Sequence, residues 1–269
     1  MTTDSSKGTT NGTPTDTLLT TLLGGLVAAP PAGLTDSLMD DVFARWVTAS
    51  SDIGTVCVAF TPAGVQFLRP GADEDQRAEF TRTYRSRFGR PLIAAAKPPA
   101  GVLPALRGRP TRTLQLDLSA LSAFERAVLT VTRRIPAGQA RPYSWVAREA
   151  GNAGAVRAVG SVLARNPLPL IIPCHRVVRA DGTLGQYLFG SDCKEQLLRF
   201  EGANLDEVSD LAQHGVHYLA SATTKIVCFP TCRDARRISL RHRHGFSTLS
   251  AALAAGYRPC QHCRPAAAA

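Results

Sequence analysis

Three side chains that can act together in nucleophilic chemistry follow one another along the chain. Cys174 carries a thiol, His175 an imidazole and Arg176 a guanidinium, and they come directly after an apolar run, 168–172, and a proline. Positive charge beside a thiol lowers its pKa toward the reactive thiolate. A cysteine at the end of an apolar run is also common as inert core packing, so the local pattern leaves both interpretations open.

The residues that flank this group favour a reactive thiol. Pro173 has no backbone N–H, which favours the end of a strand and the start of a turn just before Cys174. Downstream, Glu201 offers a carboxylate that could orient the imidazole, as the third group does in nucleophile–base–acid arrangements. We therefore expect a strand that ends at Pro173, with the thiol in the turn that follows.

A second group of cysteines lies near the C-terminus, as two close pairs with 27 residues between them. Two pairs that each chelate one ion are typical of a tetrahedral zinc site with four thiolates, and the total of 7 cysteines fits a disulfide framework poorly. Cys57, inside an expected strand, is interpreted as core packing, and Cys193 as a bystander in the first turn of a helix. The expected zinc ligands are Cys228, Cys232, Cys260 and Cys263.

The charge distribution of the 269-residue chain favours a polyanionic partner. A net charge of +10 arises from 31 basic and 21 acidic residues. The basic excess falls in two blocks, with ten Lys/Arg against four Asp/Glu in 133–199 and eight against one in 225–264, which suits nucleic acid. The sequence shows no signal-peptide pattern and no apolar run of about 18 residues. We expect no membrane association and a reduced, cytoplasmic protein.

The first half of the chain predicts a small α/β subdomain over 35–118. Residues 1–34 are expected to be disordered, apart from a short helix over 17–27. An amphipathic helix is expected over 38–47 and a second helix over 73–88. Strands are expected over 54–60, 65–68 and 114–118, the first two joined by a turn that contains Pro62 and Gly64.

The segment 119–205 predicts the helices that would position the thiol. A helix over 119–135 begins with a capping box formed by Ser122 and Glu125. Two short helices, 144–150 and 155–164, are separated by a glycine-containing turn, and this pattern indicates a helix-turn-helix whose second helix carries Arg157 and Arg165. A final helix is expected over 192–200.

The residues around Cys174 resemble the O6-alkylguanine-DNA alkyltransferase family. The resemblance covers roughly 124–202 and includes an Asn-Pro at 166–167, Pro-Cys-His-Arg-Val at 173–177, Gly-x-Tyr at 185–187 and a helix that ends in Glu201. It implies single-turnover repair, in which a cysteine irreversibly accepts the alkyl group of O6-alkylguanine in double-stranded DNA. In the implied roles Cys174 is the acceptor, His175 the base acting through a water, Glu201 its orienting group, Tyr187 the donor to guanine O6, and Asn166 a hinge residue that leads to the active-site strand.

The same resemblance implies how DNA would be held. The alkylated base has to leave the stack to reach a pocket. Arg157 is implied to replace the flipped nucleotide and Tyr143 to press on the neighbouring phosphate, with Arg165 and Arg176 as further DNA contacts. Gly185 and Gly190 are implied to keep the pocket lip open, and the bulk of Leu188 and Phe189 between them favours small alkyl groups over benzyl-sized ones.

The C-terminal segment 206–265 resembles the zinc domain of the bacterial Ada family, on the stretches 223–228, 236–237 and 254–265. The resemblance implies that Cys228 is both a zinc ligand and the acceptor of a methyl group from a DNA methyl phosphotriester. Four thiolates and one Zn²⁺ carry a charge of roughly −2, and methylation leaves roughly −1, so DNA binding should tighten. A purely structural zinc site stays open as the alternative, because Phe229 replaces a common arginine. His242 and His244 are expected on an exposed basic face and not as ligands.

Together these patterns predict an α+β protein with three parts: an N-terminal α/β subdomain, a helix-turn-helix alkyltransferase domain and a small zinc-binding domain, followed by a tail, 266–269. We expect a DNA-repair transferase that binds one zinc ion and works as a monomer in the cytoplasm, near the nucleoid of a bacterium. The alternative is a sensor of alkylated DNA, or a transcriptional regulator of the adaptive response, that uses methylated Cys228 as a switch.

Overall fold

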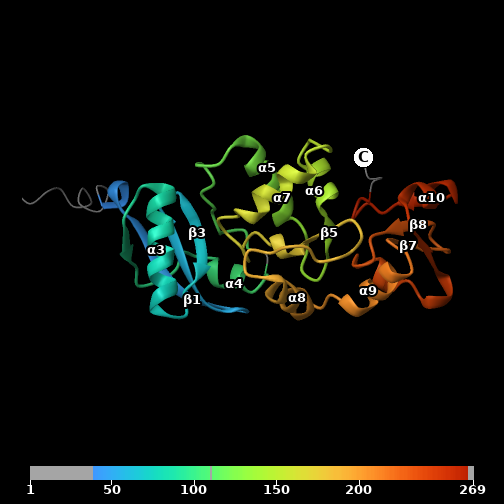
Figure 1. The fold of residues 1–269 in the computed structure, drawn as a ribbon, viewed down its shortest axis with the longest axis horizontal. Helices are drawn as coiled ribbons and strands as arrows, with labels where there is room; N and C mark the ends of the chain where they lie inside the picture. Colours follow the sequence, from blue (N-terminus) through green and yellow to red (C-terminus); the bar gives the residue numbers. More distant parts are fainter. Residues whose placement is uncertain (1–38, 110, 266–269) are drawn as a thin grey trace, which may run out of the picture. The chain divides into compact units, whose positions relative to one another are not determined.

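The computed structural model describes residues 39–109 and 111–265, which form a mixed α+β structure (Figure 1). The described residues from Phe43 onward belong to one compact unit. The expected disorder of 1–34, the expected helix over 17–27 and the tail 266–269 lie outside the described residues. None of the described helices is both long and apolar enough to cross a membrane.

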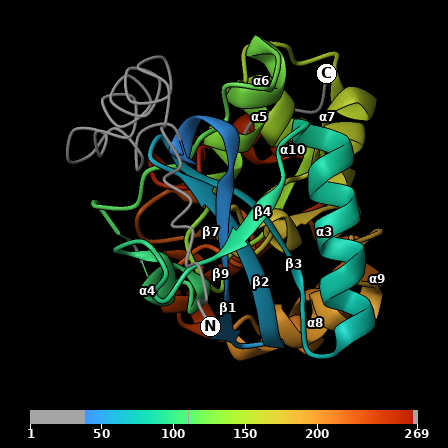
Figure 2. The ribbon, with the colours of Figure 1, turned by 90° about the vertical axis from the view of Figure 1, so that its left-hand side faces the viewer.

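The first region is a four-stranded sheet in the order β3-β2-β1-β4, with helix α3 (Glu74–Phe88) along one face (Figure 2). Strands β1, β2 and β3 are antiparallel, and β4 runs parallel to β1. The strands are β1 (Ala44–Ser51), β2 (Gly54–Thr61), β3 (Gly64–Pro70) and β4 (Leu92–Ala94). The expected strands over 54–60 and 65–68 and the helix over 73–88 are therefore confirmed.

Alternate side chains of this sheet enter two different cores. Cys57 and Ala59 of β2 pack with Phe80 of α3. Their neighbours Val56 and Val58 point the other way, into the larger core, which also takes in helix α4 (Val102–Leu106). The period of two follows from the pleat of a strand, and it explains why both faces of this sheet are covered. The expectation that Cys57 is core packing is confirmed, since the residue is 0% exposed.

Two expected elements of this region differ in the structure. The helix expected over 38–47 is confirmed only at 39–42. Residues 44–47 form the start of β1, because Ala44 and Trp46 face α3 at a period of two while the backbone pairs with β2. Residues 114–118 form no strand. Leu116 makes a single parallel bridge to Val65, supported by bonds from Val65 N to Gln115 O and from Asp117 N to Val65 O.

The central region is helical. Helix α5 (Ala123–Arg133) begins with the expected capping box between Ser122 and Glu125, which is confirmed. Helices α6 (Tyr143–Glu149) and α7 (Val156–Ala164) follow, with a turn of six residues between them, as the helix-turn-helix pattern predicted. Helix α8 (Ser191–Phe200) is also confirmed, whereas α9 (Leu205–Gln213) was not foreseen.

The apolar run before Cys174 is not a strand, so this expectation is wrong. Residues 166–173 form turns and bends, and Leu170 has a positive φ of 71°. A one-turn 3-10 helix, η1 (Cys174–Arg176), begins immediately afterwards and leads into β6 (Val177–Val178). Strand β6 pairs in parallel with β5 (Arg141–Pro142). The turn expected at Cys174 is present, but the segment before it is held by side-chain bonds and not by a sheet.

The third region is a second four-stranded sheet, in the order β10-β8-β7-β9. Helix α10 (Leu249–Ala254) covers it through a small core that contains Val227, Ala252 and Tyr257. Two further one-turn helices, η2 (Ala235–Arg237) and η3 (Leu240–His242), lie in the connection between β8 and β9. The strands are β7 (Tyr218–Ser221), β8 (Ile226–Cys228), β9 (Arg243–Phe246) and β10 (Arg258–Pro259).

Candidate functional site

Cys174 opens η1 and is 4% exposed. The amide of Asn166 reaches its sulfur, with Nδ2 donating to Sγ at 3.1 Å and also to Ile172 O at 2.9 Å. Asn166 Oδ1 accepts a bond from Leu168 N at 3.0 Å, which fixes the amide orientation. Burial raises the pKa of Cys174 above its ordinary value, and the Asn166 donor, which favours the thiolate over the thiol, opposes part of this rise. The expected hinge residue therefore contacts the expected acceptor directly.

His175 and Arg176 both bind the carboxylate of Glu201. His175 Nε2 lies 2.8 Å from Glu201 Oε1, and Arg176 donates from Nε to Oε2 at 2.9 Å and from Nη2 to Oε1 at 2.6 Å. The amide of Gly138 adds a bond to Oε2 at 3.1 Å. Burial by itself raises the pKa of Glu201, but the bonds to His175 and Arg176 outweigh it and hold this pKa at about 2. Glu201 is therefore an anion at neutral pH.

The ionised state of Glu201 decides which nitrogen of His175 is basic. A carboxylate can only accept, so Nε2 carries the proton that is donated to Glu201. Nδ1 then holds a free lone pair, and it is buried with no hydrogen-bond partner. Burial lowers the pKa of His175 below its ordinary 6.5, against the opposing effect of Glu201, so the imidazole is neutral at pH 7. An unpaired, neutral imidazole nitrogen is suited to accept a proton.

Two cations that the sequence reasoning missed lie near the sulfur. Lys194 of α8 is 0% exposed, and its Nζ donates to Val177 O at 2.6 Å. Burial lowers the pKa of Lys194 to about 8, while the Cys174 thiolate raises it. Arg69 of β3 donates from Nη1 to Asn166 O at 3.2 Å. Both positive charges lower the pKa of Cys174, against the larger effect of burial, which raises it.

A signal for Lys194 was present in the sequence. Lys194 shares one face of α8 with Leu197 and Leu198, at spacings of three and four residues, and all three are buried. A lysine on the apolar face of an amphipathic helix is rare unless it is paired or functional. Arg69 gave no comparable signal, because its position depends on how β3 meets the turn at 166–167, where Leu68 N donates to Pro167 O at 2.8 Å.

An aromatic side chain of the loop 185–190 contacts the ring of His175. The rings of His175 and Tyr187 meet edge to face at 6.1 Å, and those of Tyr187 and Phe189 at 5.5 Å. The hydroxyl of Tyr187 is buried without a hydrogen-bond partner. Burial is the largest cause that raises the pKa of Tyr187 far above its ordinary range, so its proton stays in place. Tyr143, the first residue of α6, is half-buried, and its hydroxyl would lie 3.7 Å from a Cβ placed on Gly185.

The structure separates the expected DNA contacts into two groups. Arg157 is exposed on α7, and its guanidinium makes no bond within the described residues. Arg165 is exposed and lies 3.9 Å from Glu125. Arg176 is different, because it is 5% exposed and its donors are bound to Glu201 and to Ile135 O at 2.6 Å. The expected DNA contact of Arg176 is therefore corrected: its guanidinium orients Glu201.

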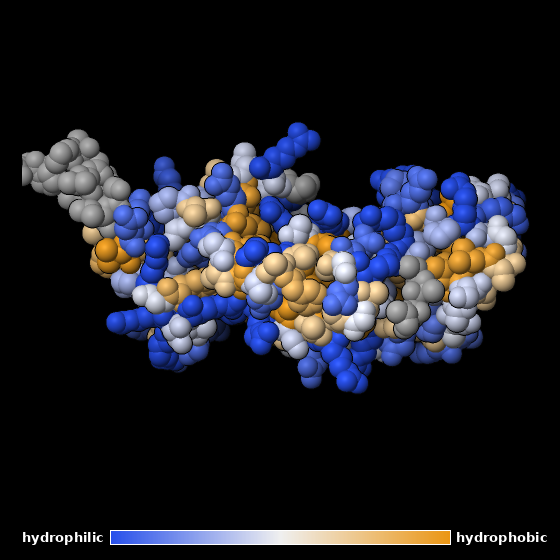
Figure 3. Space-filling model, turned by 90° about the horizontal axis from the view of Figure 1, so that it is seen from above, coloured by the Kyte–Doolittle hydropathy of each residue, from blue (hydrophilic) through white to orange (hydrophobic). Residues whose placement is uncertain are grey.

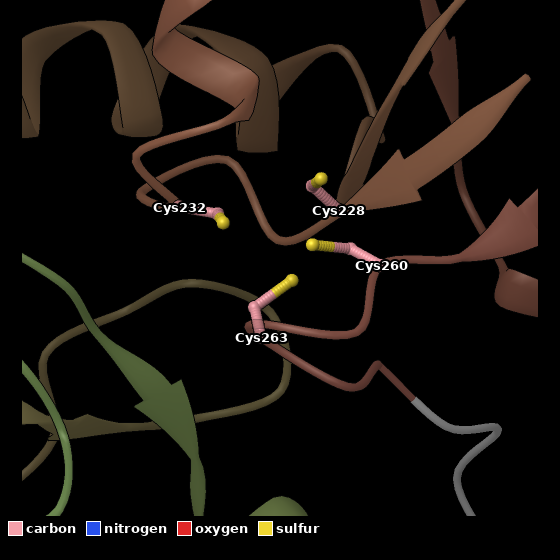
Figure 4. A group of neighbouring side chains, drawn as sticks. All are labelled: Cys228, Cys232, Cys260 and Cys263. Atoms are coloured by element: carbon pink, nitrogen blue, oxygen red, sulfur yellow. The ribbon is translucent and has the colours of Figure 1, made fainter. Parts of the chain in front are cut away.

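The four C-terminal cysteines come together as expected (Figure 4). Their sulfur atoms all lie within 4.8 Å of one another, and every residue of the group is buried. Tetrahedral Zn²⁺ with four thiolates at about 2.3 Å has sulfur atoms about 3.8 Å apart. The cluster fits this ion with small adjustments, and no disulfide links any cysteine. The structure brings together Cys228, Cys232, Cys260 and Cys263.

The backbone explains how this cluster forms. Cys228 ends β8, and Cys260 directly follows β10, which pairs with β8 in parallel. Cys260 N donates to Val227 O at 2.9 Å, and Cys232 N closes a tight turn onto Phe229 O at 2.9 Å. Of the two histidines expected on an exposed face, His244 is exposed and its Nδ1 lies 2.9 Å from the Tyr257 hydroxyl oxygen, whereas His242 is half-buried.

Asp234 and His262 border the cluster and were missed by sequence reasoning. Asp234 Oδ2 lies 2.6 Å from His262 Nδ1 and 3.3 Å from the sulfur of Cys260. The other ring nitrogen of His262 lies 2.7 Å from an Nη2 of Arg233. The sequence placed Asp234 two residues after Cys232 and His262 just before Cys263, but their pairing appears only once the two cysteine turns are folded together.

Two family models match this chain. Residues 123–203 match the DNA binding domain of 6-O-methylguanine DNA methyltransferase, and residues 207–266 match the metal binding domain of Ada. The two matches fall on the two centres described above. Each family was named from its motifs alone, and both predictions are confirmed.

Individual proteins are similar to parts of this chain. The chain is 36% identical over 175 residues to the bifunctional transcriptional activator/DNA repair enzyme Ada of Escherichia coli, covering 61% of this chain and 47% of that protein. It is 45% identical over 91 residues to a methylated-DNA–protein-cysteine methyltransferase of Methanothermobacter thermautotrophicus, covering 34% of this chain and 51% of that protein. The chain thus spans about half the length of the curated relatives it matches. A crystal structure of Mycobacterium tuberculosis OGT in complex with DNA is 28% identical, over 61% of this chain and 98% of that one, with a TM-score of 0.47.

Proposed function

We propose that this chain, in which a DNA-binding domain of the 6-O-methylguanine DNA methyltransferase family is joined to a metal-binding domain of the Ada family, repairs DNA by moving an alkyl group from O6 of guanine onto Cys174. The observation that carries the proposal is the arrangement around one sulfur. A cysteine that served only as core packing would be surrounded by apolar groups. Cys174 instead has Asn166 at 3.1 Å and the buried cation Lys194 nearby.

The transfer is a displacement at the alkyl carbon. A bridging water carries the Cys174 proton to His175 Nδ1, whose lone pair is otherwise unpartnered, and Glu201 stabilises the imidazolium that results. The thiolate then attacks the alkyl carbon, a C–S bond forms, and the bond from that carbon to guanine O6 breaks with its electron pair left on guanine. The hydroxyl of Tyr187 donates to O6 as charge develops there, which stabilises the leaving group. The thioether product is stable, so each molecule acts once.

The burial of the sulfur defines how a base reaches it. With Cys174 4% exposed, a purine reaches the sulfur only if part of the surrounding structure moves, and we assign this movement to loop 185–190, whose Tyr187 ring meets that of His175 at 6.1 Å. This loop starts and ends at Gly185 and Gly190, whose φ angles of 68° and 90° other residues rarely adopt. Arg157, exposed and unpaired in the described structure, is suited to fill the space of the flipped nucleotide. Seen from the side on which α6 and α7 lie, the surface is mixed, with hydrophilic residues around a more hydrophobic area near the middle of the view (Figure 3).

A direct test uses a duplex that contains O6-methylguanine. We expect intact-mass and peptide analysis to place one methyl group on Cys174, in a reaction that stops at one equivalent. Cys174→Ser should show no transfer, and the matched control Cys193→Ser, a nearby cysteine outside the centre, should react normally. Methylation of Cys193 in place of Cys174 would refute the assignment.

A second acceptor function is proposed for Cys228. It belongs to the metal cluster, and four thiolates without positive compensation would repel one another strongly. A bound Zn²⁺ would keep these sulfurs deprotonated and nucleophilic. The chain's own contribution is to hold Cys228 at the end of β8 with its sulfur facing the other three. Exposure to DNA that carries methyl phosphotriesters should methylate Cys228; retained zinc with an unmodified Cys228 would favour a purely structural site.

We further propose that the protein acts as a monomer in the cytoplasm, associated with the nucleoid of a bacterium, with alkylated double-stranded DNA as its main partner and DNA methyl phosphotriesters as a second. The two basic blocks support this choice of partner. A regulatory role, with methylated Cys228 as a switch, is the alternative, favoured by the likeness to a protein named as a transcriptional activator and repair enzyme. Methylation that raises affinity for one promoter sequence over unrelated DNA would support regulation.

A further inference from the structure

A short segment, residues 138–141, lies against both centres. We call it the connecting segment. It leaves the turn after α5 at Gly138 and ends at Arg141, the first residue of β5. Its residues Gln139, Ala140 and Arg141 are 6%, 9% and 2% exposed. Side chains from both centres bond to its backbone, so it links the expected acceptor Cys174 to the metal cluster through a few named contacts.

One end of the connecting segment holds the carboxylate of the first centre. Gly138 N donates to Glu201 Oε2 at 3.1 Å. The approach is close, because a Cβ placed on Gly138 would come within 2.4 Å of Glu201 O, and the φ angle of 69° also favours glycine. At the other end, Arg141 pairs with Val177, which directly follows η1. The connecting segment therefore borders the catalytic turn on two sides.

The metal-binding domain grips the same segment. Thr231, which lies between Cys228 and Cys232, accepts a bond from Ala140 N at 2.9 Å and donates to Ala140 O at 3.1 Å. Arg236 donates from Nη2 to Gly138 O at 3.3 Å and from Nη1 to Gly202 O at 3.1 Å. Gly202 is the neighbour of Glu201, so Arg236 spans the two backbone segments that position this carboxylate.

A buried cation completes the junction. The guanidinium of Arg141 donates to Ala140 O at 2.8 Å and to Gln139 Oε1 at 2.6 Å. Its carbon lies 5.7 Å from the ring of Trp145 on α6 and 5.5 Å from the ring of Phe229, the neighbour of Cys228. The Arg141 guanidinium thus lies between Trp145 of the alkyltransferase domain and Phe229 of the metal-binding domain. These contacts restrict the motion of the connecting segment.

We infer that the metal-binding domain is a positioning element of the alkyl-transfer centre. Thr231 and Arg236 hold the connecting segment, the segment holds Glu201 through Gly138, and Glu201 orients the imidazole of His175. The turn that carries Thr231 is closed by Cys228 and Cys232, so metal binding shapes the part that grips the segment. This inference rests on the proposed function of Cys174, and it gives the second domain a part in base repair beyond any chemistry of its own.

The expected loss in transfer rate follows from the hydrogen bonds that each substitution removes. Removing the Thr231 hydroxyl leaves the buried N–H and C=O of Ala140 without their partner, which loosens the segment. The Glu201 carboxylate keeps its bonds from Arg176, so the substitution should shift its position without freeing it from the centre. We therefore expect about a tenfold slower transfer and not abolition. Glu201 raises the pKa of His175, so a looser Glu201 should also move the acid limb of the pH–rate profile to lower pH.

The test uses the full, zinc-loaded chain with matched pairs of variants. Thr231→Val removes the hydroxyl that contacts Ala140, and Thr223→Val makes the same change at an exposed site. Arg236→Met is paired with Arg237→Met, an exposed neighbour whose guanidinium makes no bond within the described residues. For each protein we would measure bound zinc, hydrogen exchange at the amides of residues 138 and 140, and the single-turnover rate of methyl transfer to Cys174 across pH.

The expected result is normal zinc content, faster exchange at residues 138 and 140, slower transfer and a lowered pH midpoint in Thr231→Val and Arg236→Met, with both controls like the wild type. Stripping zinc from the wild type should reproduce the loss, and adding Zn²⁺ back should restore it. Transfer within twofold of the controls, with unchanged exchange, would overturn the inference. Failure of the proposed function looks different, because the wild type itself would then leave Cys174 unmodified.

Discussion

The two centres of this chain prepare a cysteine sulfur in contrasting ways. Around Cys174, groups from distant parts of the chain alternate in charge, and each buried charge has a partner; Glu201 is bound by His175 and Arg176, and Lys194 by a backbone carbonyl. In the metal cluster four cysteine sulfur atoms lie within 4.8 Å of one another, and as thiolates they would all carry negative charge. The first centre is complete in the protein alone, whereas the second requires a cation to be stable.

This difference teaches where the information for each site lies. The metal cluster is encoded locally, by two pairs of cysteines in two turns on neighbouring strands. The centre at Cys174 is assembled from β3, the irregular segment 166–173, η1, α8 and the residue that follows α8. Replacing one metal ligand should therefore abolish the second centre. Replacing a residue of the first centre should slow alkyl transfer, and the effect should be smaller the farther that residue lies from the Cys174 sulfur.

The largest effect is expected for removal of a metal ligand. In Cys263→Ser the cluster keeps three thiolates, and most of the roughly 10 kcal/mol that a structural zinc ion contributes to folding is at risk. Hydrogen exchange should show lost protection in β7–β10, with β1–β3 still protected. Full protection of both sheets in Cys263→Ser would contradict this difference between the centres. Cys193→Ser, which removes a cysteine outside the metal cluster, is the matched control.

A smaller effect is expected when the buried cation beside Cys174 is removed. In Lys194→Met the pKa of the Cys174 thiol should rise further, because one of the two positive charges that lower it is gone, and transfer at pH 7 should slow about tenfold. The single-turnover rate measured against pH checks this, since the loss should be recovered at higher pH. Lys97→Met, which removes an exposed lysine, serves as control. A uniform loss at every pH would argue for a packing effect only.

Glu201 should leave a signature in acid stability. Its folded pKa of about 2 lies below the ordinary 4.5, so its stabilising contribution is present above pH 4.5 and is lost as pH falls toward about 2. A shift of this size corresponds to about 3 kcal/mol. Unfolding by denaturant at stepped pH should show this slope in the wild type and a flatter one in Glu201→Gln. Parallel curves for the two proteins would contradict the assignment.

The smallest effect concerns the size of the alkyl group. Phe189 packs edge to face on Tyr187 at 5.5 Å, and the Tyr187 ring in turn meets that of His175 at 6.1 Å. Phe189→Gly should raise the rate with O6-benzylguanine several-fold relative to O6-methylguanine, with little change for the methyl substrate. Val42→Gly, which removes an exposed apolar side chain elsewhere, is the control. Equal rates for both substrates in the wild type would contradict the preference for small groups.

The elements that could be predicted from the sequence are those specified by neighbouring residues. The capping box at Ser122 and Glu125, the helices of the central region and the four cysteines were all predictable because neighbouring residues specify them. The segment before Cys174 was wrongly expected as a strand. Its apolar residues are buried in turns, where Asn166 supplies the bonds that a sheet would have made. Hydrophobic content alone does not distinguish these two solutions.

Long-range pairing explains the other differences. Residues 44–47 have an apolar pattern that fits a helix, but β1 gains a partner on each side in the sheet order β3-β2-β1-β4. The family resemblance implied a DNA contact for Arg176, yet its guanidinium is bound by Glu201, which lies 25 residues away in the sequence. Lys194 and Arg69 were missed for the same reason, since their role depends on which surfaces meet the sulfur.

The central claim, alkyl transfer to one sulfur activated by its neighbours, is tested most directly by mass spectrometry of the wild type, Cys174→Ser and Cys228→Ser after incubation with O6-methylguanine duplex DNA. The account predicts a single methyl group on Cys174 in the wild type and in Cys228→Ser, and none from guanine in Cys174→Ser. Loss of guanine repair in Cys228→Ser with Cys174 intact and zinc bound, or repair that survives in Cys174→Ser, would contradict it.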